Sequence, residues 1–252
     1  MTEALAYGGL VLAGVGAGAL NAIAGGGSLI TFPSLVGFGL AEKVANATNA
    51  CALVPGTLSA LGGYRDCIQE VKPYMLGYTL PTTVGSILGT AILLQTSDEV
   101  FRWAVPVLIL FATVLLAIQP RIKAWTMTHQ GTISPRWGWF FQFLISIYGG
   151  YFGAGMGILM LAYMGATLPL DMHAQNALKG YLATIINLVA AVVFVAKGLV
   201  VWGPCVAVLL GSVVGGYAAA RLAIRSAPEK VRPLVIAVGV IMTIIFGVRL
   251  FV

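Results

Sequence analysis

Long apolar runs separated by short polar stretches dominate the chain. In the first half these runs cover residues 5–24, 28–40, 44–64, 73–94 and 100–119. In the second half the series recurs at 137–152, 156–168, 172–196, 199–222 and 231–251. About 20 apolar residues in a helix span the roughly 30 Å of hydrocarbon in a bilayer. The pattern predicts an all-α integral membrane protein with one transmembrane domain, made of repeat one (1–119), a polar cytoplasmic linker (120–136) and repeat two (137–252).

The second run of each half is shorter than its neighbours. Residues 28–40 and 156–168 each form a segment of about 13 residues, too short to cross the hydrocarbon. We expect short broken or re-entrant helices there. Each short segment either forms a hairpin with the preceding run, or the two cross the membrane one after the other. In both versions the five segments of one half change sides an odd number of times. The second half therefore enters from the opposite face, which predicts two inverted-topology repeats of five hydrophobic segments each.

A glycine-rich break precedes each short segment. Residues 24–28 read Ala-Gly-Gly-Gly-Ser, and residues 153–157 read Gly-Ala-Gly-Met-Gly, about 128 residues later. Glycine lets the backbone bend or approach a ligand closely, and the helix that restarts beyond it has unsatisfied N–H groups. Such N-termini attract anions. Paired breaks of this kind indicate the binding site of a transporter.

Composition supports a membrane protein and excludes other classes. Of 252 residues, 59% are hydrophobic and 9% charged, against about 25% charged in soluble domains. The net charge is +6, but the basic residues are spread through loops without interleaved aromatics, so nucleic acid is not an expected partner. Three unclustered cysteines indicate neither a disulfide framework nor a metal site, and no cofactor is expected.

Basic residues also predict the orientation. Lys and Arg are enriched in short cytoplasmic loops, and the alternation of segments places nine on one side and four on the other. The nine are Arg65, Lys72, Arg121, Lys123, Arg136, Arg221, Arg225, Lys230 and Arg232; the four are Lys43, Arg102, Lys197 and Arg249. We therefore expect a multi-pass protein of the cytoplasmic (inner) membrane, in contact with lipid, with both termini outside.

Lys179 belongs to neither loop set. It lies roughly 10 Å inside the segment that begins near Met172, where a cation usually faces a partner or a polar cavity. The alternative is that its long side chain reaches the cytoplasmic interface. The matching segment of the first half is uncharged but polar, with Asn46, Thr48, Asn49, Thr57 and Ser59. These side chains either line a cavity or bond neighbouring helices; as a set they favour a cavity.

Acidic residues are missing from the predicted membrane interior. All eight fall in loops or at segment ends: Glu3, Glu42, Asp66, Glu70, Asp98, Glu99, Asp171 and Glu229. A cation site or carboxylate relay would need them inside, so the electrostatics favour an anion. An enzyme is not expected, because an intramembrane serine protease needs a base near its nucleophile and the only histidines, His129 and His173, lie in the linker and at a segment start.

The motifs around the first break resemble the sulfite exporter TauE/SafE family, also described as the four-toluene sulfonate uptake family. The resemblance lies in residues 21–33 (NAIAGGGSLITFP), 45–49 (ANATN) and 55–65, while the counterpart at 153–157 and 174–179 is looser. It implies a secondary carrier for sulfite, organosulfonates such as sulfoacetate, or other small anions, usually moving outward. Ala154 and Met156 depart from the glycines common in the second repeat.

Together these observations predict an anion site near the midplane, with alternating access and no catalytic or metal residues. The substrate-binding candidates are Asn21, Gly25, Gly26, Gly27, Ser28, Asn46, Thr48, Asn49, Gly153, Gly155, Gly157, Gln175, Asn176 and Lys179. A passive anion channel is the alternative function. Export can run on the membrane potential alone, or couple to protons through His173 or Asp171. Small residues at 211–216 suit contacts within the chain or a homodimer equally.

Overall fold

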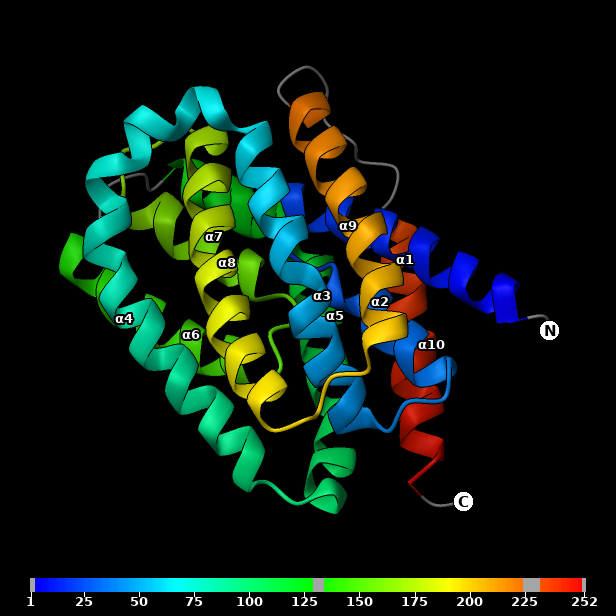
Figure 1. Ribbon diagram of the computed structural model, residues 1–252. Coiled ribbons are helices and arrows are strands. Elements are labelled where there is room, and N and C mark those ends of the chain that lie inside the picture. The colour runs from blue at the N-terminus through cyan, green and yellow to red at the C-terminus, as the bar shows by residue number, and fades with distance from the viewer. Residues whose placement is uncertain (1–2, 129–133, 224–231, 251–252) are drawn as a thin grey trace.

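The computed structural model describes residues 3–128, 134–223 and 232–250, and this part of the chain contains ten α-helices, one 3-10 helix and no strands (Figure 1). The first half comprises α1 (Glu3–Ile23), α2 (Ser28–Gly37), α3 (Glu42–Gly63), η1 (Arg65–Cys67), α4 (Ile68–Gln95) and α5 (Asp98–Thr128). The second comprises α6 (Pro135–Tyr151), α7 (Met156–Thr167), α8 (Met172–Ala196), α9 (Trp202–Ala223) and α10 (Arg232–Val248). The predicted all-α class is confirmed.

Five stretches in the described residues are long and apolar enough to cross a membrane: Glu3–Ile23, Arg65–Gln95, Asp98–Thr126, Met172–Ala196 and Trp202–Leu222. α3 is long but more polar, because it carries Asn46, Thr48 and Asn49. Those three side chains are buried against other helices, so the bilayer does not have to solvate them. The chain therefore has the helices of a multi-pass membrane protein.

Helices from the two halves pack against one another rather than forming separate bundles. α1 of the first half packs on α9 of the second, and α6 of the second half packs on α4 of the first. α3 contacts α9, α4 contacts α8, and α3 and α8 contact each other near the centre of the molecule (Figure 1). α2 lies against α10, and α7 against α5. Neither half has a complete core without the other.

Both short helices turn back along the helix before them. Next to α2, the rings of Phe38 and Tyr7 lie 5.2 Å apart, so the end of α2 returns toward the start of α1. On α7, the Tyr163 hydroxyl donates to Gln142 Oε1 of α6 at 2.9 Å. With 10 and 12 residues, α2 and α7 extend about 15 and 18 Å. Both halves thus contain a longer helix with a short helix packed back along it, and the re-entrant arrangement of these pairs in a membrane stays a prediction.

The polar linker expected at 120–136 begins later than predicted. α5 continues through Pro120 to Thr128, and residues 129–133 lie outside the described part. The reason is packing: Thr126 is buried, and a Cβ built on Gly165 of α7 would come within 2.5 Å of the Thr126 Cβ. Contact with α7 thus extends α5 beyond its apolar run, which the hydropathy pattern did not reveal.

The small-residue face at 211–216 packs within the chain. Cβ atoms added to Gly211 and Gly215 of α9 would collide with the carbonyl oxygens of Val11 and Val15 of α1. Close backbone approach is the use that small residues have in membrane helix pairs. The predicted homodimer stays a prediction.

The two glycine breaks cross at the centre of the molecule. Gly25 has a φ of 89°, a backbone angle that residues other than glycine rarely adopt. A Cβ added to Gly157 would lie 2.5 Å from the Gly25 Cα, and a Cβ on Gly25 would collide with the Gly157 backbone. The first break therefore rests directly on the N-terminal turn of α7.

We expect Gly25→Ala to destabilise the protein by about 2–5 kcal/mol, because it adds a strained φ to an overpacked backbone contact. Gly8→Ala in α1, the helix that precedes the break, is the control, since nothing lies within 4 Å of its added Cβ. The midpoint of thermal unfolding in detergent, followed by size-exclusion chromatography, measures the effect. Equal midpoints for the two variants would contradict the close contact between Gly25 and Gly157.

Candidate functional site

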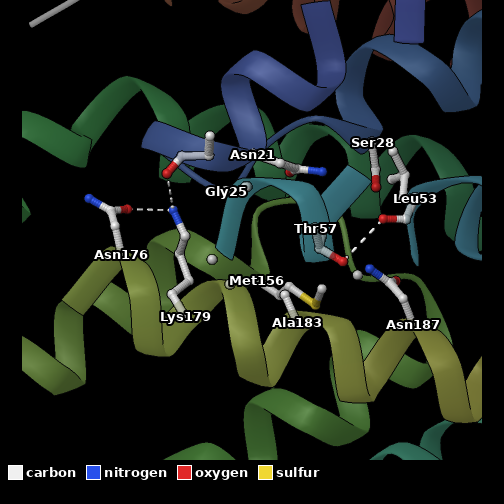
Figure 2. A pocket seen from close by; sticks show the side chains of 15 residues that line it. Asn21, Gly25, Ser28, Leu53, Thr57, Met156, Asn176, Lys179, Ala183 and Asn187 are labelled. Carbon is white, nitrogen blue, oxygen red and sulfur yellow. Dashed lines mark hydrogen bonds between the residues drawn. The ribbon is translucent and has the colours of Figure 1, made fainter. Parts of the chain in front are cut away.

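A small cavity lies beside the crossing of the breaks. Its volume is about 20 Å³, which is room for about one water molecule. Its lining comes from both breaks and from α3 and α8: Asn21, Ala22, Gly25, Ser28, Leu53, Thr57, Ala60, Gly153, Met156, Gly157, Asn176, Lys179, Gly180, Ala183 and Asn187. Figure 2 shows these side chains facing a common space between the helices. A larger solute requires the site to widen.

The break after α1 supplies the first wall. Asn21 Oδ1 accepts a hydrogen bond of 2.7 Å from the amide of Gly27, so Asn21 satisfies one of the free amides at the start of α2. Across the described residues, the amides of Ser28 and Gly157 find no acceptor. Both residues line the cavity. One free donor from each restarted helix is thus available beside the cavity.

Lys179 reaches the cavity from α8 and is 2% exposed. Its ammonium donates to the carbonyl of Ala22 at 3.1 Å and to Asn176 Oδ1 at 2.6 Å (Figure 2). Ala22 lies in the last turn of α1, where helix carbonyls are unsatisfied and a cation is stabilised by the helix dipole. Both acceptors are neutral, so an anion in the cavity would be the first full negative charge beside Lys179.

No carboxylate lines the cavity in the part of the chain that the structure describes. Asp66 pairs with Arg221 at 3.0 Å, and Asp98 pairs with Lys43 at 3.4 Å. Both pairs lie at helix ends, where the aspartates are mostly exposed. The interior is therefore neutral to positive, and an anion entering it meets no like charge.

Three predicted polar residues of α3 lie outside the cavity lining. Asn49 Nδ2 donates to the hydroxyl of Ser28 at 3.1 Å, so it positions a lining residue. Asn46 Nδ2 donates to the carbonyl of Tyr151, the last residue of α6, at 3.0 Å. The Thr48 hydroxyl accepts from the amide of Val201 at 3.1 Å, just before α9. These side chains hold helix ends in place.

Four other candidates also lie outside the lining. Gly26 faces apolar side chains, and the Gly27 amide already bonds Asn21. Gly155 has a φ of 78° and lies against Ala112 of α5. Gln175 Nε2 donates to the Leu170 carbonyl at 2.8 Å. The structure thus gathers seven of the predicted residues around the cavity: Asn21, Gly25, Ser28, Gly153, Gly157, Asn176 and Lys179.

Sequence reasoning missed Asn187 entirely and did not include Thr57 among the candidates. Both line the cavity, at its end away from Lys179. A signal was present: Asn176, Lys179, Ala183 and Asn187 recur at spacings of three and four, which places them on one helical face. Extending that face two turns beyond Lys179 finds Asn187.

Comparison with known proteins agrees with this architecture. The family model described as sulfite exporter TauE/SafE matches residues 10–246. The chain belongs to the TauE/SafE family. The probable membrane transporter protein YfcA of Escherichia coli K12 is 23% identical over 248 residues, covering 96% of this chain and 90% of the relative.

Two further relatives are also named probable membrane transporter proteins. One, from Haemophilus influenzae, is 25% identical over 225 residues, covering 89% of this chain and 88% of the relative. The other, ORF9 of a Sinorhizobium species, is 24% identical over 234 residues, covering 90% and 87%. No solved structure matches the chain significantly. Family and relatives together indicate a membrane transporter.

Asn21→Ala is expected to lower stability by about 1–2 kcal/mol, because the Gly27 amide loses its acceptor. Ser34→Ala is the control: it lies in α2, the short helix whose start Asn21 caps, and its hydroxyl donates to the Ile30 carbonyl of the same helix. The comparison uses the shift in unfolding midpoint of the purified protein. If Asn21→Ala unfolds no earlier than Ser34→Ala, Asn21 does not stabilise the start of α2.

Proposed function

We propose that this protein is a secondary transporter that carries a small sulfur-containing anion across the cytoplasmic membrane. The substrate is sulfite or an organosulfonate such as sulfoacetate, and the direction is outward. The observation that carries the proposal is a cavity between two broken helices that contains a buried lysine and free helix amides, and no carboxylate. These are the groups that replace water around an anion in a dehydrated site.

The proposed mechanism is alternating access between two inverted repeats. Support comes from reciprocal positions on α3 and α8: Asn46 and Asn176, Asn49 and Lys179, and Thr57 and Asn187 are each 130 residues apart. The packing is reciprocal too, with α1 on α9 and α6 on α4. Rocking of one repeat against the other exposes the central site to each side in turn.

A carrier is favoured over the passive channel that the sequence left as an alternative. The cavity holds about 20 Å³, and the backbones of Gly25 and Gly157 touch beside it. A sulfite ion is larger than a water molecule, so the anion moves only after the breaks separate. Expelling one negative charge gains about 2.3 kcal/mol per 100 mV of inside-negative potential, which drives export without a coupled cation.

Labelled sulfite is expected to accumulate in proteoliposomes preloaded with unlabelled sulfite, but not in empty ones, because a carrier exchanges its substrate. Competition by sulfonates, sulfate and chloride then ranks the anions. Equilibration that is independent of preloading would instead identify a channel. No flux above protein-free vesicles would refute the sulfite assignment.

Lys179→Met is expected to raise the KM for sulfite about 10–100-fold, because it removes a charged donor from the site. Lys197→Met is the matched control: it changes the same residue type at the exposed C-terminal end of the same helix. The initial rate of counterflow as a function of sulfite concentration separates them. An unchanged KM in folded Lys179→Met would leave Lys179 only its structural hydrogen bonds to Ala22 and Asn176.

The proposed orientation, with both termini outside, is tested on a background in which the three cysteines are replaced by serine. Glu70→Cys places a single thiol in the first turn of α4, and Asp98→Cys places one beyond the opposite end of α4, at the start of α5. We expect a membrane-impermeant maleimide to label Asp98→Cys in intact cells and Glu70→Cys only after lysis. The reverse labelling pattern would invert the orientation.

A further inference from the structure

The end of the cavity away from Lys179 contains a polar side chain without a partner. Asn187 lines the cavity and is 7% exposed. Of the hydrogen bonds within the described ranges, none involves its side chain. In Figure 2, Lys179 and Asn187 lie at opposite ends of the same face of α8, with Met156 and Ala183 between them.

The neighbouring hydroxyl is already satisfied, which sets Asn187 apart. Thr57 Oγ1 lies 3.1 Å from the Leu53 carbonyl, to which it can donate, and accepts from the Thr184 hydroxyl at 3.0 Å. Asn187 keeps both amide hydrogens and its carbonyl oxygen for another group. Because Asn187 lines the cavity, a ligand group can bond its amide there in place of water.

The spacing between the two ends defines the ligand. Lys179 and Asn187 are eight residues apart on one helix, or about 12 Å. That rise separates the two backbone positions, so a ligand that bonds both side chains is longer than a single sulfite ion. The side chains of Met156 and Ala183 lie between the two ends and make this part of the wall apolar (Figure 2). A ligand with a polar group at each end of a short hydrocarbon chain matches this order of polar, apolar and polar surfaces.

We propose that Asn187 is a specificity-determining residue that binds a second, hydrogen-bonding group of an organic anion whose anionic group lies at Lys179. The inference rests on the proposed anion transport and deepens it. The favoured substrate class is a short-chain alkanesulfonate with a terminal hydroxyl or amide group. Sulfite fills only the Lys179 end and is the weaker substrate.

Competition against labelled sulfite in proteoliposomes tests the assignment with matched pairs: propane-1-sulfonate against 3-hydroxypropanesulfonate, and butane-1-sulfonate against 4-hydroxybutanesulfonate. The wild-type protein is expected to prefer the hydroxylated member of each pair about tenfold. Asn187→Leu, which has a similar size and no hydrogen-bonding group, removes that preference. Lys179→Met weakens both members alike, because they share the sulfonate.

Asn187→Gln provides a second measurement if the leucine variant does not fold. Its side chain is one methylene longer, so the best hydroxyalkanesulfonate becomes one carbon shorter than for wild type. A purely structural role for Asn187 does not move this optimum. If both sulfonates of each pair compete equally at the wild-type protein, or if the preference persists in folded Asn187→Leu, the role of Asn187 is overturned. The proposed anion transport is not affected by either result. Absence of any sulfite or sulfonate flux overturns the proposed function as well.

Discussion

The contact between Gly25 and Gly157 is the constraint on which the rest of the structure depends. Two interrupted helices meet there, backbone against backbone, because neither residue has a side chain to separate them. That approach brings the end of α1 and the start of α7 to one point. The cavity, Lys179 and the free amides of Ser28 and Gly157 all lie around that point.

Breaking a helix inside a membrane leaves carbonyl and amide groups that lipid cannot solvate. Here side chains satisfy them, and two of the three described below come from the opposite half. Lys179 and Tyr64 donate to the Ala22 carbonyl at the end of α1, and Asn46 donates to the Tyr151 carbonyl at the end of α6. The polar residues of α3 and α8 therefore stabilise the breaks and surround the site at the same time. This dual use explains why so few of them have free hydrogen-bonding groups.

The molecule contains two kinds of helix, long and short. Long helices such as α4 and α9 pack along their length on helices of the other half, whereas α2 and α7 extend only about 15 and 18 Å. The short helices present their N-terminal turns at the cavity, so a small shift of either one changes its shape. Sulfite-sized solutes need such a shift, since the cavity has room for about one water molecule.

The sequence by itself determined the class of protein, the ten apolar segments and the two breaks, because membrane length and glycine content are local properties of the chain. It also identified Lys179, since a charge inside an apolar run is visible without a structure. Only the tertiary structure decided that the short helices pack back along the helices before them, that α5 continues to Thr128, and that Asn49 positions Ser28 while Asn187 faces the cavity. Those features depend on which helices become neighbours, and contacts between residues more than a hundred positions apart leave no local pattern.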